Sequence, residues 1–261
     1  MNRIDERFSE LRQAKRPAFM PFIVGGDPDF KTSLKIVKTL CQNCDFLEVG
    51  FPYSDPLADG PTIQAADMRA LRSGATPDLV FRLIKNIRRF SDIPITVLVY
   101  ANLVLQKGID EFYRAAKKSG IDGVLIPDAP VEEIESFAKA AEENGIRQIF
   151  LVSQTTTNQR LKATLKHAQG FLYLVSILGV TGARRSFTKE TSQFIRRIKS
   201  QANLPLCVGF GVSSAKQFKN MIKSGADGVI VGSALINVIA NNLRSKLVLK
   251  KVRDFASQFT G

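Results

Sequence analysis

The chain has 261 residues, of which 44% are hydrophobic and 23% are charged, a balance that excludes a disordered polymer and predicts a globular protein with a sizeable core. No apolar run approaches the roughly 18 residues of a transmembrane helix. The 37 Lys and Arg residues against 24 Asp and Glu residues give a net charge of +13, which indicates nucleic acid or an anionic small molecule as a binding partner.

The amino-terminal residues and the cysteines bear on location. The first ten residues, MNRIDERFSE, carry five charges and no apolar stretch, so we expect no secretory signal. Three cysteines are too few for a disulfide framework, which favours the reducing cytoplasm. Cys41 and Cys44 form a C-x-x-C motif, interpreted as small buried hydrophobic residues, with a redox pair as the alternative. The one histidine, His167, leaves too few ligands for a zinc site.

Short runs rich in β-branched and aromatic residues alternate with helical patterns along the chain. The predicted strands span residues 18–24, 45–49, 95–100, 123–127, 148–152, 171–175, 206–209 and 228–231. Strict alternation favours parallel strands, because each parallel pair needs a crossover connection, and eight such units close into a (β/α)₈ TIM barrel. An open doubly wound sheet is the alternative. No linker or change in composition divides the chain, so residues 1–261 are predicted to form a single domain.

Helix boundaries are predicted from capping signals. Asp27 and Pro28 have the residue types preferred at the N-cap and the first helical position, and apolar residues recur at helical spacing over 30–41. Another helix is predicted to end at the Asn-Gly pair at 144–145. The segment 81–90, FRLIKNIRRF, mixes basic and apolar residues, and we interpret its charges as a solvated helix face. No nucleic-acid-binding motif accompanies them.

The second predicted strand carries a carboxylate at its end. Side chains alternate along a strand, so Phe46 and Glu48 point to one side and Leu47 and Val49 to the other. If Phe46 points into the barrel, Glu48 does too, at the carboxyl ends of the strands where barrel active sites lie. An apolar surrounding raises the pKa of a carboxyl group, which suits a proton donor near neutral pH. A structural ion pair with a lysine is the alternative.

The segment 50–64, GFPYSDPLADGPTIQ, follows this strand and contains three prolines. It is predicted to be a long, stiff loop that carries Asp59 over the same pocket as Glu48. Two carboxylates in different environments can divide acid and base roles. Aspartates that only form turns are the alternative.

Glycine-containing loops follow the last three predicted strands, namely GVTGARR at 179–185, GFGVSS at 209–214 and GSALIN at 232–237. Their backbone N–H groups, with the N-terminus of a helix predicted near Ser233, can hold a phosphate group where barrels commonly bind one. Glycines needed only for tight turns are the alternative. No lysine lies at a predicted strand end, which argues against Schiff-base chemistry, and no cluster of histidines or carboxylates suggests a metal.

The chain resembles the tryptophan synthase alpha subunit in the segments LEVGFPYSDPLADGPTIQ (47–64), VYANLV (99–104), GVTGAR (179–184), GFGVSS (209–214) and GVIVGSALI (228–236). The resemblance extends along almost the entire chain, and its first motif is highly specific. It implies a carbon–carbon lyase that cleaves indole-3-glycerol phosphate to indole and glyceraldehyde 3-phosphate in tryptophan biosynthesis. It implies no cofactor in this subunit.

The resemblance also implies roles for individual residues. By matching motif positions, Glu48 protonates C3 of the indole and also takes the proton from the glycerol hydroxyl. Asp59 binds the indole N–H and stabilises the positive charge on the ring. The residues implied to line the indole pocket are Phe22, Tyr100, Leu125, Leu151 and Tyr173. Those implied for the substrate-closing loop and the phosphate cradle are Thr181, Gly182, Phe210, Gly211, Gly232 and Ser233.

The same resemblance implies an alpha2-beta2 complex with a pyridoxal-phosphate beta subunit, to which indole is passed internally. Two other functions are alternatives. The first is another phosphate-binding barrel, such as indole-glycerol-phosphate synthase or a sugar-phosphate isomerase; the synthase should have a catalytic lysine at a strand end, which this chain lacks. A catalytically silent barrel that only activates a partner would be expected to lack Glu48 or Asp59, and both are present.

Overall fold

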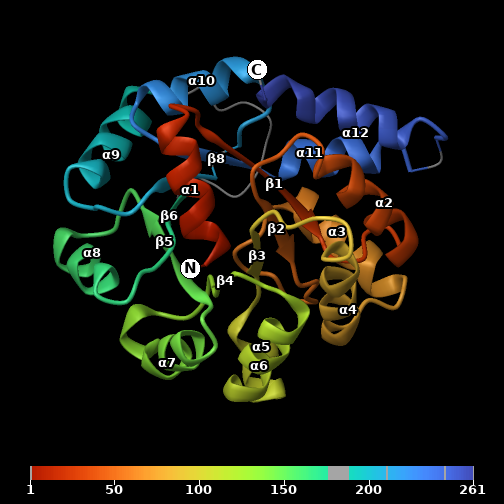
Figure 1. Ribbon diagram of the computed structural model, residues 1–261, viewed down its shortest axis with the longest axis horizontal. Helices are drawn as coiled ribbons and strands as arrows, with labels where there is room; N and C mark the ends of the chain where they lie inside the picture. Colours follow the sequence, from red (N-terminus) through yellow and green to blue (C-terminus); the bar gives the residue numbers. More distant parts are fainter. Residues whose placement is uncertain (1, 176–187, 210, 244, 261) are drawn as a thin grey trace.

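The computed structural model describes residues 2–175, 188–209, 211–243 and 245–260 of the chain (Figure 1). Within them, strands form a closed parallel barrel in which each strand pairs with the next and the last pairs with the first. The strands are β1 Ala18–Val24, β2 Leu47–Gly50, β3 Ile95–Leu98, β4 Gly123–Leu125, β5 Arg147–Ser153, β6 Leu172–Val175, β7 Leu206–Val208 and β8 Gly228–Val231. The predicted TIM barrel is therefore confirmed, and the open doubly wound sheet is excluded because the β1–β8 pair closes the ring.

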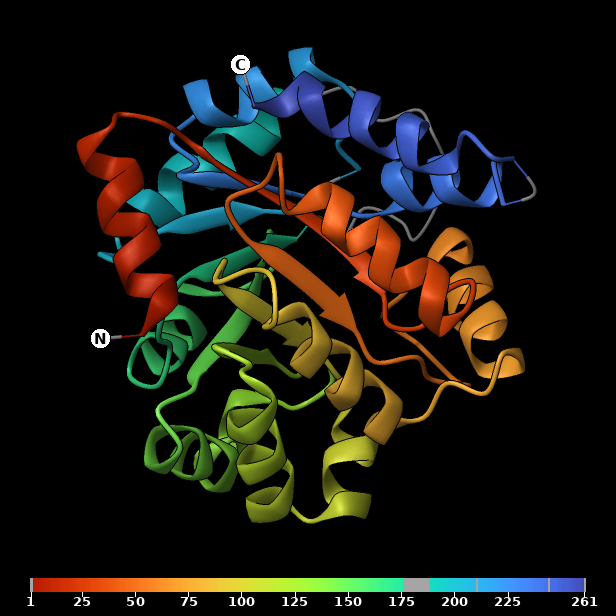
Figure 2. The same ribbon diagram turned by 45° about the vertical axis from the view of Figure 1, so that its right-hand side comes forward.

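Helices surround this barrel (Figures 1 and 2). They are α1 Arg3–Gln13, α2 Phe30–Leu40, α3 Pro61–Arg72, α4 Pro77–Ile87, α5 Ala101–Lys107, α6 Ile109–Ser119, α7 Glu135–Glu143, α8 Asn158–Leu165, α9 Lys189–Lys199, α10 Ala215–Lys223, α11 Ser233–Ala240 and α12 Val248–Ala256, with 3₁₀ turns η1 Val131–Glu133 and η2 Ser257–Phe259. Helix α4 illustrates how they attach, because Val80, Leu83 and Ile84 are fully buried in the layer between helices and strands. None of the helices described is long and apolar enough to span a bilayer.

Alternation along the strands separates two apolar layers. Leu47 and Val49 belong to the outer layer between strands and helices, whereas Phe46 belongs to the cluster inside the barrel. Glu48 lies two residues after Phe46 and is paired in register with Phe22 of β1, which is also in the inner cluster. The predicted orientation of this strand is confirmed, and Glu48 is completely buried.

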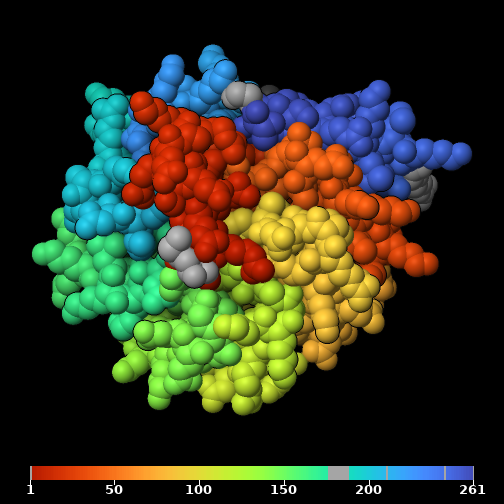
Figure 3. All heavy atoms as spheres, viewed as in Figure 1, coloured from red at the N-terminus to blue at the C-terminus, as the bar shows by residue number. Residues whose placement is uncertain are grey.

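Helix α1 closes the amino end of the barrel. Its buried residues Ile4, Phe8 and Leu11 join the inner cluster, and the Phe8 ring lies 4.6 Å from the ring of Phe46. The red atoms of this helix run across the face seen in Figure 3. Sequence analysis did not predict α1, although Asn2 is a good N-cap whose side chain accepts a hydrogen bond from the Ile4 N–H. Because α1 covers the amino end of the barrel, the carboxyl end is the one open to a substrate.

Two local predictions are wrong. Helix α2 is capped by Asp29, whose side chain accepts from the Thr32 N–H at 2.9 Å, and not by Asp27. Asp27 binds Arg69 instead, in two hydrogen bonds of 2.8 Å each. The loop expected over 50–64 ends at Gly60, because Pro61 takes the first position of α3. Asp29 was missed because it lies directly after a residue pair with the same capping preferences.

In the basic segment 81–90, Arg82, Lys85 and Arg89 are exposed, as predicted for a solvated helix face, and only Arg88 departs from this pattern. Arg88 follows α4 and is half-buried at the amino end of the barrel, where it donates to Asp122 at 2.6 Å and to the Gly120 carbonyl. Asp122 in turn accepts from the Ile95 N–H at the start of β3. The positive charge of Arg88 therefore stabilises the fold and is not available to bind a partner.

Candidate active site

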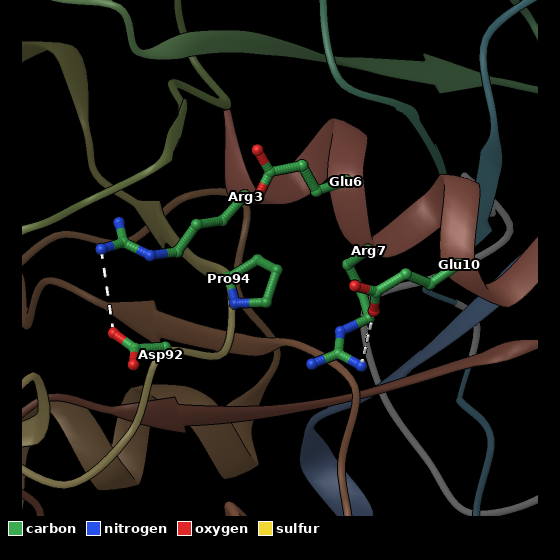
Figure 4. Close-up of a pocket in the computed structure, with 6 residues that line it drawn as sticks. All are labelled: Arg3, Glu6, Arg7, Glu10, Asp92 and Pro94. Atoms are coloured by element: carbon green, nitrogen blue, oxygen red, sulfur yellow. Dashed lines mark ion pairs between the residues drawn. The ribbon is translucent and has the colours of Figure 1, made fainter. Parts of the chain in front are cut away.

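A hollow at the amino end of the barrel is lined by Arg3, Glu6, Arg7, Glu10, Asp92 and Pro94 (Figure 4). Its arginines face carboxylates within the hollow, since Arg3 lies 3.9 Å from Asp92 and Arg7 lies 3.1 Å from Glu10. Pro94 directly precedes β3, so the hollow lies where strands start. Parallel barrels carry their active sites at the opposite end, where the strands finish. The candidate site is therefore sought above Glu48.

Glu48 is a buried carboxyl group with little compensation. Its side chain is 0% exposed, and Tyr173 donates to Oε2 over a long distance of 3.5 Å. Among the residues the structure describes, Oε1 has no hydrogen-bond partner. The pKa of Glu48 is raised to about 8, mainly by burial; the hydrogen bond from Tyr173 opposes this shift, and the charge of Asp59 adds to it. Glu48 therefore holds a proton at neutral pH and can donate it.

Asp59 lies near the end of the loop 51–60, which connects β2 to α3. Tyr100 donates to its Oδ2 at 2.8 Å, and the Tyr100 hydroxyl accepts from the Ala58 N–H at 3.0 Å. Gln64 of α3 holds the Asp59 carbonyl oxygen at 2.8 Å. Burial raises the pKa of Asp59, while the Tyr100 hydrogen bond favours its charged form. The carboxylate is thus held by Tyr100, the N-cap of α5, while α3 holds the backbone of Asp59.

Tyr53 completes this side of the site and was missed by sequence analysis. Its ring stacks on Tyr100 with 5.0 Å between ring centroids, and its hydroxyl accepts from Asn102 at 3.2 Å. The stack keeps the Tyr100 hydroxyl directed at Asp59. No signal in the chain pairs these two tyrosines, because they lie in different loops.

The structure brings four of the five residues implied for an indole pocket into the interior of the barrel. Phe22, Leu125 and Tyr173 are buried in the inner cluster, and Leu151 is packed against it. Tyr100, the fifth, follows β3 and contacts Asp59. The wall around Glu48 is therefore mainly apolar.

The residues implied for a phosphate cradle lie partly within the described chain. Ser233 is the first residue of α11, as predicted, and Gly232 is the N-cap. A glycine cap has no side chain to accept from the first N–H groups of the helix, which leaves them suited to an anion. Gly211 has a φ of 31° and lies in the loop between β7 and α10. Thr181, Gly182 and Phe210 lie outside the described residues.

Gly209 is required where β7 ends against Tyr173. A Cβ atom at this position would lie 2.4 Å from Cε1 and 2.6 Å from the hydroxyl oxygen of Tyr173. Because Tyr173 contacts Glu48, we expect Gly209→Ala to displace that ring and to lower the free energy of unfolding by about 1–3 kcal/mol. Chemical denaturation measures this cost. In a double-mutant cycle with Tyr173→Leu the cost should shrink, and an unchanged cost would mean that the methyl group clashes elsewhere.

These groups define an acid–base enzyme of the barrel class, since a protonated carboxyl group and a second carboxylate flank one apolar interior. Comparison with known proteins identifies the family. The family model for the tryptophan synthase alpha chain matches residues 8–260 of this chain. The alpha chain of Methanothermobacter thermautotrophicus is 49% identical over 248 residues, which cover 94% of this chain and 92% of that protein.

Solved structures agree with this relationship. The alpha subunit from Legionella pneumophila has a TM-score of 0.93 at 33% identity, covering 100% of this chain and 97% of that chain. The a2b2 complex from Pyrococcus furiosus includes a chain with a TM-score of 0.88 at 36% identity, covering 93% and 97%. This chain belongs to the tryptophan synthase alpha chain family, lyases that cleave indole-3-glycerol phosphate in tryptophan biosynthesis.

Proposed function

We propose that this chain cleaves indole-3-glycerol phosphate by a retro-aldol reaction in which Glu48 is the acid–base group and Asp59 is the counter-charge. The observation that carries the proposal is the complete burial of Glu48 above an apolar interior, which raises its pKa to about 8. A group that starts protonated is what the first step of this reaction needs.

Glu48 can serve both proton transfers in sequence. Its proton passes to C3 of the indole, which leaves a carboxylate on Glu48 and a positive charge on the ring. That carboxylate then takes the proton of the adjacent glycerol hydroxyl. The carbon–carbon bond breaks, its electron pair returns to the ring, and the released fragment becomes the aldehyde of glyceraldehyde 3-phosphate. Glu48 ends the cycle protonated, so the reaction consumes no net proton.

Asp59 is proposed to accept a hydrogen bond from the indole N–H and to stabilise the positive charge that develops on the ring. Its hydrogen bond from Tyr100 supports this role, because it holds the Asp59 carboxylate in place before the reaction begins. A carboxylate that is already in place needs no reorganisation when the positive charge develops. Tyr53 stacks on Tyr100 and is proposed to keep that donor in place.

The remaining substrate contacts are proposed in two groups. The indole ring would lie among Phe22, Tyr100, Leu125, Leu151 and Tyr173, since these surround the two carboxyl groups with apolar surface. The phosphate would lie at the N-terminus of α11, with Gly211, Gly232 and Ser233 as contacts. The additional contacts Thr181, Gly182 and Phe210 rest on the sequence resemblance.

The experiment that tests the function is direct. Purified protein is incubated with indole-3-glycerol phosphate, and release of indole is followed by fluorescence, which the chain does not obscure because it has no tryptophan. Glu48→Gln serves as the control for contaminating lyase. Indole release that is equal in both preparations would refute the assignment.

The chain is further proposed to need no cofactor of its own and to assemble with a beta subunit that holds pyridoxal phosphate. The Pyrococcus furiosus relative forms an a2b2 complex, which supports this arrangement. The cytoplasmic location and the single domain over 1–261 stay predictions from the sequence.

We expect the beta subunit to dock at the carboxyl end of the barrel through the loop 51–60. Leu57 in this loop is 92% exposed, more than any other large apolar side chain that the structure describes, which offers an apolar contact to a partner. Hydrogen exchange with the cognate beta subunit should protect the backbone of this loop and leave α1, at the opposite end, unchanged. Protection confined to α1 and its neighbours would contradict the docking direction.

A further inference from the structure

Asp67 is a buried carboxyl group that the reaction does not use. It lies in the middle of α3, and the residue is only 4% exposed. Within the described part of the chain, its Oδ2 atom has no hydrogen-bond partner. An isolated carboxylate in such a place would be strongly disfavoured.

Among the residues that the structure describes, the neighbours of Asp67 do not supply a positive charge to pair with it. Arg69, on the same helix, is held by both oxygens of Asp27, so its guanidinium is already paired. The charges of Asp59 and Asp27 repel a charge on Asp67, and Tyr100 is also near enough to interact with it. Burial is the largest cause of a pKa raised to about 8, the two aspartates add to it, and the Tyr53 backbone N–H opposes it.

Asp67 is linked to the site by the way α3 and the loop 51–60 pack together. Helix α3 begins at Pro61, two residues after Asp59. The Tyr53 backbone N–H faces the Asp67 carboxyl, while the Tyr53 ring stacks on Tyr100, the donor to Asp59. A charge on Asp67 would therefore act on both ends of this loop.

We propose that Asp67 is a positioning residue for Asp59: it stays uncharged beneath the loop 51–60, which lets the loop pack against α3 and leaves the negative charge on Asp59. This inference rests on the proposed role of Asp59. Ionisation of Asp67 would draw water to the base of the loop and set a second negative charge against Asp59, which displaces the carboxylate that the reaction needs.

The first test measures stability and needs no activity. The free energy of unfolding is compared from pH 5 to pH 8 for the wild type, Asp67→Asn and Asp67→Ala. In the unfolded chain Asp67 loses its proton near pH 4, whereas in the folded protein it keeps the proton to a higher pH. Ionisation that occurs only in the unfolded chain favours unfolding, so wild-type stability should fall as pH rises. Both neutral variants lack this decline, so their free energy of unfolding relative to the wild type should rise from pH 5 to pH 8. The slope of this difference against pH should correspond to at most about one proton.

The two variants guard against a simple packing defect. Asp67→Ala leaves a small cavity and is expected to be less stable than Asp67→Asn at every pH, but with the same slope relative to the wild type. Asp92→Asn, at an exposed carboxyl group, controls for the loss of one surface charge. Curves for the Asp67 variants that run parallel to the wild type would overturn the proposal.

The second test separates positioning from mere support of the fold. The kcat for indole release by Asp67→Asn should equal the wild-type value within about twofold at pH 7, and the ratio of variant to wild type should rise by up to about tenfold at pH 9. The change should be in kcat and not in KM. A ratio that does not depend on pH would overturn the positioning role. If the wild type releases no indole, the proposed function fails, whereas the unfolding experiment still decides whether Asp67 is held uncharged.

Discussion

Glu48→Gln should lower kcat for indole release by about 1,000-fold or more while indole-3-glycerol phosphate still binds. The amide has nearly the shape of the protonated carboxyl group, but it cannot give a proton to indole C3 or take one from the glycerol hydroxyl, so both transfers are lost. Steady-state kinetics measure kcat, and isothermal calorimetry measures substrate binding by the inactive variant.

The pH dependence of the wild type provides an independent check on this role. Because the pKa of Glu48 is raised to about 8, the free enzyme holds the required proton below that pH and loses it above, so kcat/KM should fall on the alkaline side. The same shift predicts that Glu48→Gln becomes more stable relative to the wild type as pH rises from about 4 to 8, since Glu48 loses its proton in the unfolded chain near pH 4 but keeps it in the folded protein to about pH 8, which lowers wild-type stability over this range. A variant with more than a tenth of wild-type turnover would move the acid role to another group.

The sequence predicts the barrel well because local patterns determine most of it. Runs of β-branched residues are short and separated by amphipathic segments, and no strand boundary is misplaced by more than two residues. The orientation of Glu48 follows from alternation alone, since Phe46 is apolar and lies two residues earlier on the same face. The period of the apolar residues within one strand or helix is therefore enough to predict where the element lies and which side chains face the core.

Other features depend on contacts between distant segments, which no local pattern encodes. Asp27 has the sequence environment of a helix cap, yet it binds Arg69, 42 residues away. Tyr53 and Tyr100 meet only because β2 and β3 are neighbours in the barrel. Asp67 occupies a helical position that its polarity alone would assign to the surface, and its burial becomes evident only when α3 is packed against β1.

Asp59→Asn should lose activity by a different route from Glu48→Gln. The amide can still accept from Tyr100, but it carries no negative charge to offset the positive charge on the protonated indole ring. Removing a fixed electrostatic partner of this kind costs about 3 kcal/mol in transition-state stabilisation, or roughly 100-fold or more in kcat. The loss should appear in kcat measured on the isolated subunit, with a smaller change in KM, because the charge develops only after the substrate has bound.

Asp55→Asn is the matched control, since Asp55 lies in the same loop but is exposed, and its carboxylate accepts from the neighbouring Ser54 hydroxyl at 2.5 Å. It removes the same charge from the same loop without touching the pocket, so kcat of the isolated subunit should stay within about twofold of the wild type. The comparison distinguishes a charge at one position from the total charge of the loop. If Asp59→Asn retained near-normal kcat, or if both variants lost activity equally, Asp59 would be reduced to a residue that shapes the turn before α3.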